Sequence, residues 1–317
     1  MQTQVVISQI FILAVVVVIG AIAARFRVFT SESKDILSKI IFNISLPLML
    51  FTNFFRLEAT PRLISNSLTV LAVSGFVILL LFLLGLTASR IFRFKGQEAA
   101  VFKVHSMFGN TIFLGFPLIT ALYGVEGLLY ASMFQLVSTI IMWTAGVVIL
   151  SQGNGGTWKK SLLRVINPNT IATLAGLVFF ILSVRLPEII LSPMSELGSA
   201  NTWLSMLYIG AMLVFAQTGR LLRRRELYAV SLNRLILGPF FLIAVFYLAS
   251  AIAGFTPDKL VSSVIILEAS MPCMATVVIM AKEFGSDDRL AVGNVFISTV
   301  LSIITLPVVV MALEKLM

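Results

Sequence analysis

The sequence of 317 residues has few of the side chains from which catalytic and metal sites are usually built. It contains one cysteine, Cys273, and one histidine, His105, and only 12% of its residues are charged. A single cysteine excludes a disulfide within the chain and a metal site made of several cysteines. No His-Glu-x-x-His motif occurs, and no serine in a Gly-x-Ser context accompanies His105. We therefore expect no catalytic residue and no enzyme activity.

Apolar residues fill most of the remaining chain. They make up 59% of the sequence, and the mean hydropathy of +1.04 is well above that of a soluble domain. A helix needs about 20 apolar residues to cross a bilayer, and polar clusters divide the chain at about that interval. This spacing predicts an all-α membrane protein with ten transmembrane helices. The predicted spans are residues 5–24, 36–55, 68–90, 103–123, 128–150, 169–190, 198–218, 233–254, 260–282 and 289–313.

The positive charges predict the orientation of these helices. Most of the 23 lysines and arginines fall beside alternate loops, and cytoplasmic loops are those that accumulate such residues. The opposite side receives only Arg56, Arg62, Arg185, Lys259 and Lys315. Both termini are therefore expected on the non-cytoplasmic side of the cell membrane. The same loops account for the net charge of +9, so we expect no nucleic acid partner.

The ten spans divide into two sets of five. The longest polar interruption, SQGNGGTWKKSLLRVINPN, separates residues 1–150, the expected first repeat, from residues 169–317, the expected second repeat, with residues 151–168 as a cytoplasmic linker. Because each set has an odd number of spans, the second set enters the membrane from the opposite face. Homologous halves would then form an inverted repeat, an arrangement found in many secondary transporters.

The fourth span of each half contains residues that interrupt helices. GNTIFLGFPLITALYG in the first half holds Gly109 and Pro117, and EASMPCMATVVIMAKEFG in the second half holds Pro272. Proline removes a backbone hydrogen bond, and lipid cannot satisfy the freed groups. A lone proline is most simply a kink, but interruptions at matching positions of two halves indicate a transport site. We therefore predict helix breaks at Gly109, Pro117 and Pro272, in segments that cross near the middle of the bilayer.

Polar residues accompany both breaks. Asn110 and Thr111 follow Gly109, and Cys273 follows Pro272. The half-helix that begins after each break presents free amide groups and a partial positive charge, which suit an organic anion. We therefore predict that Asn110, Thr111, Pro272 and Cys273 bind the substrate. Hydrogen bonding between helices is the alternative role for Asn110 and Thr111.

Glu268, four residues before Pro272, is the one acidic residue well inside a predicted span. A charge in the bilayer interior is costly and usually functional, and no lysine or arginine is expected near it. We predict that Glu268 is an ion-coupling site that binds Na⁺ or takes up H⁺, with a permanently protonated structural glutamate as the alternative. His105 is expected at the cytoplasmic start of the fourth span, either as a proton relay or as an ordinary boundary residue.

Four stretches, in order and spread over nearly the whole chain, carry a family resemblance. NISLPLMLFTNFF, GNTIFLGFPLITALYG, INPNTIATLAGL and EASMPCMATVVIMAKEFG resemble the second, fourth, sixth and ninth helices of the auxin efflux carrier family, PIN-like transporters within the bile acid, arsenite and riboflavin transporter group. The resemblance implies ten helices in two inverted five-helix repeats, with broken fourth and ninth helices that cross, and an elevator motion. It also implies that Leu46, Asn110, Asn167 and Asn169 contact substrate, although an asparagine followed by proline also suits the start of a helix.

Two residues depart from the pattern of the plant members. Gly109 stands where they usually have proline, and Glu268 stands where they have an uncharged amide. The long central loop of the largest plant carriers is missing, so the chain resembles bacterial-type members, which include carriers for malate and malonate. We expect a homodimeric secondary transporter of small mono- or dicarboxylates, with Na⁺ or H⁺ as coupling ion and no other cofactor. An intramembrane enzyme, a channel and a weak-acid exporter without ion coupling are the alternatives.

Overall fold

The structure is a computed structural model that describes residues 2–152, 162–215 and 222–316. Residues 153–161 of the expected linker and the end of the expected span 198–218 lie outside the described residues. Every regular element among the described residues is a helix. The chain forms two compact units: unit 1 (Met1–Leu68, Ile112–Met133 and Ile166–Phe215) and unit 2 (Thr69–Thr111, Phe134–Val165 and Ala216–Met317). Each unit draws on both predicted halves of the sequence, and the division into two repeats stays a prediction.

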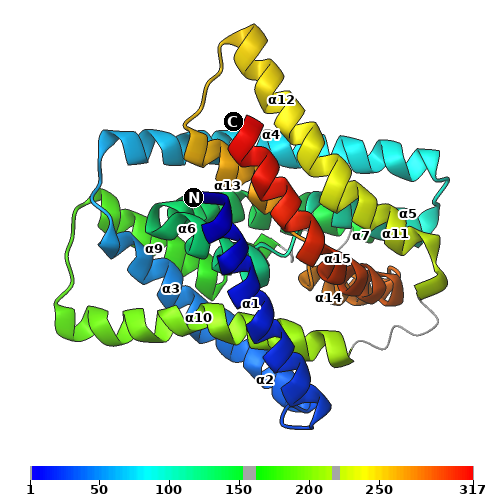
Figure 1. Ribbon diagram of the computed structural model, residues 1–317, viewed down its shortest axis with the longest axis horizontal. Coiled ribbons are helices and arrows are strands. Elements are labelled where there is room, and N and C mark those ends of the chain that lie inside the picture. The colour runs from blue at the N-terminus through cyan, green and yellow to red at the C-terminus, as the bar shows by residue number, and fades with distance from the viewer. Residues whose placement is uncertain (1, 153–161, 216–221, 317) are drawn as a thin grey trace. The chain divides into compact units, whose positions relative to one another are not determined.

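Unit 1 contains five named helices and the first part of α6 (Phe116–Ile141). The five are α1 (Gln2–Arg25), α2 (Ser31–Ile40), α3 (Leu46–Asn53), α9 (Pro168–Ile181) and α10 (Glu188–Phe215). α10 packs against α1 and α3, and α9 packs against α3 (Figure 1). The contact between α1 and α10 is close, since a Cβ on Gly210 would lie 2.0 Å from the Val17 carbonyl oxygen. Small residues that allow such an approach are typical of helix contacts in membranes.

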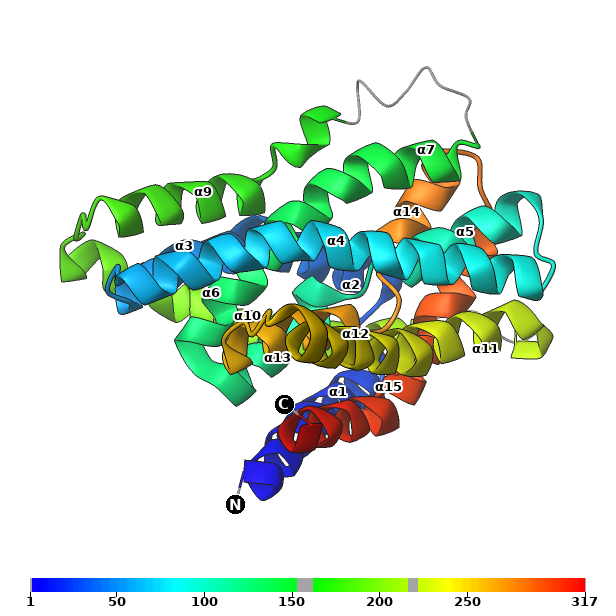
Figure 2. The same cartoon turned by 90° about the horizontal axis from the view of Figure 1, so that it is seen from above.

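Unit 2 contains the end of α6 and eight further helices, of which α4 lies mostly within it. These helices are α4 (Pro61–Ile91), α5 (Gly96–Met107), α7 (Val147–Leu150), α11 (Arg225–Leu232), α12 (Gly238–Ala253), α13 (Lys259–Ala269), α14 (Thr276–Glu283) and α15 (Asp288–Leu316). α11 continues into α12 through a π-helical turn, and α13 lies beside α12 (Figure 2). α15 packs against both α11 and α14.

Prolines in three of the helical segments are accommodated by π-helical turns. The turns η1 (Ile41–Ser45), η3 (Thr111–Gly115) and η7 (Asn233–Leu237) each end two residues before a proline, at positions 47, 117 and 239. A wider turn gives room for the carbonyl group that a proline ring would otherwise strike. The chain therefore stays helical through Pro117, and the predicted break at that residue is wrong.

Six helical segments among the described residues are long and apolar enough to cross a membrane. They are Ser31–Arg56, Pro61–Ile91, Thr111–Leu150, Glu188–Phe215, Arg225–Ile252 and Asp288–Lys315. The segment Thr111–Leu150 covers the end of the predicted span 103–123 and all of the predicted span 128–150. Between these spans lies Gly124, where φ of 63° and ψ of −148° depart from helical geometry. The predicted number of ten crossings stays a prediction.

The predicted spans 169–190 and 198–218 are displaced in the structure. α9 ends at Ile181, and α10 begins already at Glu188. Ser183, with φ of 53°, and then Pro187 lie in the connection between these two helices. Left-handed backbone and proline both end a helix, so the apolar residues around them do not continue α9.

Candidate functional site

The residues at the two helix breaks lie in unit 2 and meet through their backbones, while the chain from Ile112 onward, beyond the first break, belongs to unit 1. The first break separates α5 from η3, and the second separates α13 from α14. The Asn110 amide donates to the Pro272 carbonyl oxygen at 2.7 Å, and Gly109 forms an antiparallel bridge with Cys273. These contacts satisfy backbone groups that lipid would leave without partners. Residues that the sequence assigned to one site from two distant segments are therefore in direct contact.

A buried arginine joins the ends of α5 and α13. Arg234 lies in η7 and is only 1% exposed. Its guanidinium donates to the carbonyl oxygens of Met271 (Nε, 2.9 Å), Ser106 (Nη1, 3.0 Å), Met107 (Nη1, 3.2 Å) and Glu268 (Nη2, 3.4 Å). The last carbonyl groups of a helix lack partners within it and carry partial negative charge. One guanidinium thus binds the negative ends of both half-helices.

The position of Arg234 corrects the expectation that no lysine or arginine lies near Glu268. The sequence places it close to the Arg223, Arg224 and Arg225 cluster, so it was assigned to the same cytoplasmic loop. In the structure it belongs instead to the candidate span Arg225–Ile252, which is helical from its first residue. Proximity to a basic loop is a weak signal of exposure, because only packing decides which face of a helix a residue occupies.

Gly109 lies directly against this guanidinium. A Cβ at this position would lie 2.2 Å from Nη2 of Arg234 and 2.9 Å from both Cβ and the carbonyl oxygen of Met271. No side chain is accommodated there without displacing one of these groups. The close approach of these groups therefore favours glycine at this position.

Glu268 lies in the last turn of α13 and is fully buried. Neither of its carboxylate oxygens has a hydrogen-bond partner among the described residues, whereas its carbonyl oxygen accepts from Arg234. A buried carboxylate is costly when isolated, and a nearby guanidinium reduces this cost. The expectation that Glu268 has no basic residue near it is therefore wrong.

A chain of polar side chains extends from the first break into α6. Thr111 Oγ1 donates to Gln135 Oε1, and Gln135 Nε2 donates to Thr139 Oγ1 at 2.9 Å. All three side chains are buried. Gln135 and Thr139 were not among the predicted site residues. Their spacing of four positions within an apolar span places them on one helix face, and this was the signal that could have identified them.

α15 supplies polar partners to both broken segments. Ser298 Oγ accepts a hydrogen bond from the Cys273 amide at 2.9 Å, and Asn294 Nδ2 lies 3.0 Å from Nδ1 of His105. His105 is fully buried, and its expected place at the cytoplasmic start of a span stays a prediction. Asn294 and Ser298 also stand four residues apart in an apolar run, the same signal as in α6.

The remaining predicted substrate residues belong to unit 1. Leu46 is fully buried at the start of α3. Asn167 is the N-cap of α9, and its Oδ1 accepts from the amides of Asn169 at 3.0 Å and Thr170 at 3.2 Å. Asn169 is 6% exposed, and neither polar atom of its side chain has a partner among the described residues. Asn167 thus has the helix-starting role, and substrate contact stays a prediction for all three predicted residues.

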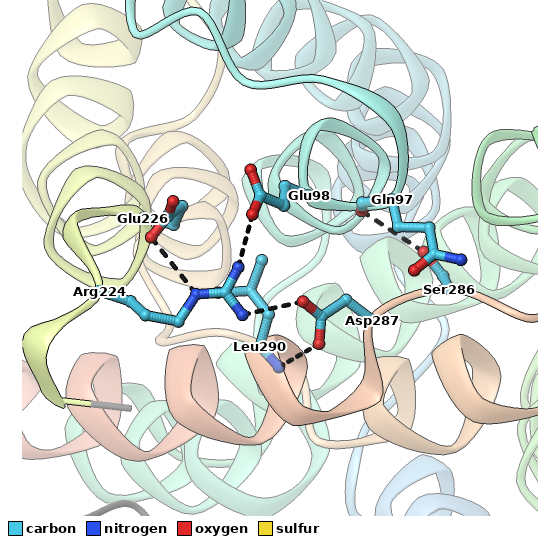
Figure 3. A network of polar contacts seen from close by, with 7 residues as sticks. All are labelled: Gln97, Glu98, Arg224, Glu226, Ser286, Asp287 and Leu290. Carbon is cyan, nitrogen blue, oxygen red and sulfur yellow. Dashed lines mark hydrogen bonds and ion pairs between the residues drawn. The ribbon is translucent and has the colours of Figure 1, made fainter. Parts of the chain in front are cut away.

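An ion network joins three helices at one end of unit 2 (Figure 3). Arg224 Nη2 lies 2.8 Å from Glu98 Oε1, Nη1 lies 2.9 Å from Asp287 Oδ2, and Nε lies 3.5 Å from Glu226 Oε2. Asp287 Oδ1 also accepts from the Leu290 amide at 2.8 Å. The network connects the starts of α5, α11 and α15, the helices that carry or support the broken segments.

A separate ion pair involves the last residue of α14. Arg164 Nη1 donates to Glu283 Oε2 at 2.5 Å, and this hydrogen bond lowers the pKa of the Glu283 carboxyl below its ordinary value. Among the described residues, no group of three or more His, Cys, Asp and Glu side chains is arranged to hold a metal ion.

Comparisons with known proteins agree with a membrane carrier. The family model described as "Membrane transport protein" matches residues 5–161 and 157–310. An uncharacterized transporter from Methanothermobacter thermautotrophicus is 28% identical over 300 residues, which cover 92% of this chain and 93% of that protein. An uncharacterized transporter from Methanocaldococcus jannaschii is 22% identical over 315 residues, covering 94% of this chain and 95% of its own length.

Proposed function

Because the chain belongs to the membrane transport protein family, which is the auxin efflux carrier family that its motifs resemble, we propose that it is a secondary active transporter of a small organic anion. The observation that carries this proposal is the contact between two broken helices deep within unit 2. Interrupted segments that meet are expensive in a membrane and are kept where a substrate or ion binds. A packing role alone would not require two of them.

The substrate class follows from the groups around the breaks. Each segment resumes as a helix, at Thr111 and at Thr276, whose first amide groups carry partial positive charge. Asn110, Thr111 and Cys273 add neutral polar groups, so a carboxylate is better suited than a cation. We propose a mono- or dicarboxylate of the malate or malonate type. Leu46, Asn167 and Asn169 of unit 1 are also proposed to contact substrate.

The proposed mechanism is alternating access of the elevator type. The residues that meet at the two breaks, and their polar partners on the end of α6 and on α15, belong to unit 2, and we propose this unit as the transport domain. Unit 1 is the proposed scaffold. The ten-helix arrangement in two inverted repeats, a homodimeric state and a place in the cell membrane with both termini outside the cytoplasm belong to the same proposal.

Glu268 is the proposed coupling residue, acting through Na⁺ or H⁺. Its burial and the lack of a hydrogen-bond partner for its carboxylate oxygens among the described residues support this role. A carboxylate that exchanges an ion with water must be unpaired in at least one state of the cycle. Transport of a weak acid without a coupling ion is the alternative.

Uptake into proteoliposomes tests the proposal. Purified protein is reconstituted, a panel of labelled mono- and dicarboxylates is offered, and a Na⁺ or H⁺ gradient is imposed in turn. We expect saturable uptake of at least one dicarboxylate and counterflow when unlabelled substrate is inside the vesicles. Saturable uptake without counterflow would indicate a channel, and an absence of uptake across the panel would reject an organic anion carrier of this class.

A further inference from the structure

Arg234 occupies the place where a broken-helix transporter would otherwise need a bound cation. Its four acceptors are all backbone carbonyl oxygens at or just beyond the ends of α5 and α13. Carbonyl groups of unwound helices, together with the negative ends of half-helices, are the groups that coordinate Na⁺ in secondary transporters. The last turn of α13 also carries the carboxylate of Glu268. Carbonyl oxygens and a carboxylate of this kind could bind a monovalent cation. Here the Arg234 guanidinium binds the carbonyl oxygens instead.

The carbonyl groups that could coordinate a cation already accept hydrogen bonds from the guanidinium. Nη2 is so close to Gly109 that even a methyl group there would lie 2.2 Å from it. Arg234 and Glu268 are both buried to 1% exposure or less, so water does not screen their charges. A sodium ion at these oxygens would lie against a fixed positive charge in a medium of low dielectric, which is strongly unfavourable.

We infer that Arg234 is a built-in substitute for a coupling sodium ion, so that substrate binding and transport by this protein are independent of Na⁺. This inference rests on the transport function proposed above and narrows its coupling ion to a proton, or to none. The charge that other carriers would take from solution is here part of the chain and stays with unit 2 throughout the cycle. The titratable groups nearest to it in the same buried network are Glu268, His105 and Cys273.

The first experiment compares wild-type protein in lipid nanodiscs in NaCl, KCl and choline chloride of equal ionic strength. We expect the thermal unfolding midpoint to be the same in all three salts. Where a substrate has been identified, its apparent affinity should change less than twofold between Na⁺ and choline. Stabilisation by Na⁺ alone, or uptake that a Na⁺ gradient drives when pH is equal on both sides, would overturn the inference.

The second experiment removes the guanidinium. Arg234→Ala frees four carbonyl oxygens and leaves Glu268 without its counter-charge, so the variant should be less stable than wild type and should now be stabilised by Na⁺, but not by choline. Adding Glu268→Gln to Arg234→Ala should remove most of that response to Na⁺. The exposed Arg223→Ala serves as matched control and should behave as wild type in every salt. An Arg234→Ala protein that is as stable as wild type and ignores Na⁺ would contradict the inference.

Two conservative variants keep the inference testable if Arg234→Ala does not fold. Arg234→Lys retains the positive charge and should fold as a Na⁺-independent protein. Arg234→Gln retains hydrogen bonding without the charge and should be less stable than Arg234→Lys in choline, with the difference reduced by Na⁺. Equal stability of the two in both salts would show that the charge is not needed. Because these measurements need no transport, they can hold even if no carboxylate is carried, and the two proposals fail separately.

Discussion

Two buried ionisable side chains, one acidic and one basic, distinguish the crossing region from the rest of the apolar chain. Glu268 and Arg234 both lie within it, and each contacts or ends a broken helix. An ionised side chain in such surroundings is kept only where something compensates it. The neutral amide and hydroxyl groups around them can form hydrogen bonds without adding charge. We therefore propose different roles for the two kinds of residue: the ionisable ones would act on ions, and the neutral ones would bind substrate.

Replacement of Glu268 by glutamine should separate driven transport from exchange. Glutamine keeps the size and hydrogen bonding of the side chain but cannot ionise, so accumulation driven by an ion gradient should be lost while exchange of substrate across the membrane persists. The exposed Glu188→Gln is the control and should accumulate substrate normally. Accumulation by Glu268→Gln at the wild-type rate over several pH values would leave Glu268 as a packing residue.

Replacement of Asn110 by alanine should weaken substrate binding without unfolding the protein. The Asn110 backbone bond to Pro272 does not depend on its side chain, so the crossing itself is retained. Loss of one hydrogen bond to a charged group costs about 1.5–3 kcal/mol, which corresponds to an affinity lower by roughly 10- to 100-fold. Asn43→Ala, at an exposed position of η1, is the matched control. Unchanged affinity in Asn110→Ala would assign Asn110 to contacts between helices.

At the scale of elements, the breaks depend on what surrounds them more than on proline. Pro117 and Pro239 follow π turns within continuous helices, whereas the first true break lies at Gly109, where no proline stands. There the helix ends because its last carbonyl groups turn to Arg234, and the chain beyond them pairs with the second segment. Whether a helix breaks therefore depends on the groups packed around it and not on the presence of a proline alone.

Gly109→Ala should destabilise the protein by roughly 1–3 kcal/mol, as expected for overpacking in a tightly filled interior. The added methyl group would strike Nη2 of Arg234. Lysine at position 234 has no such atom, so the double variant Gly109→Ala with Arg234→Lys should be less destabilised than the sum of its single variants. Gly75→Ala is the control, because its nearest neighbour would be 3.8 Å away. Thermal unfolding in nanodiscs measures all four, and additivity of the two substitutions would contradict the proposed clash.

The Arg224 network predicts a salt-sensitive contribution to stability. Arg224→Gln leaves three carboxylates, those of Glu98, Glu226 and Asp287, without their shared cation. Since the Arg224 side chain is 26% exposed, each pair should contribute at most about 1 kcal/mol. We expect a lower unfolding midpoint at low salt, with the difference from wild type shrinking in 1 M salt. A midpoint that does not change at any salt concentration would show that the network is energetically neutral.

The whole molecule combines two compact units with one predicted orientation in the membrane. The Arg224 network lies on the side of unit 2 that the positive charges assign to the cytoplasm. The packing of the two units does not reveal which side faces the cytoplasm, because the apolar interior of the bilayer is alike toward both faces. Only the asymmetry of lysine and arginine between the loops predicts it.

Cysteine labelling tests the orientation. In a Cys273→Ser background, Arg223→Cys should react with an impermeant reagent only from the cytoplasmic side. Arg185→Cys, whose position is 87% exposed, should react only from the opposite side. Arg223 is preferred to Arg224 because it is exposed and outside the ion network. The reverse labelling pattern would invert the predicted topology.

The fold class, the family and the two interrupted segments could be predicted from the sequence, because a bilayer allows only a few kinds of backbone structure. Composition alone indicates an all-helical membrane protein, four motifs identify its family, and the pairing of GNTIFLGFPLITALYG with EASMPCMATVVIMAKEFG points to the segments that meet. These signals are local, since they depend on apolar length, on residues that interrupt helices and on motif order. They do not require knowledge of which helix faces which.

Only the tertiary structure decided which side chains surround the crossing. Arg234 was assigned to a loop and His105 to the start of a span, and both are buried in unit 2 beside segments remote in sequence. The physical reason is that burial of a polar group depends on the partner supplied by another helix, and a single helix carries no record of that partner. The charge balance around Glu268 therefore became visible only when α5, η7 and α13 were seen together.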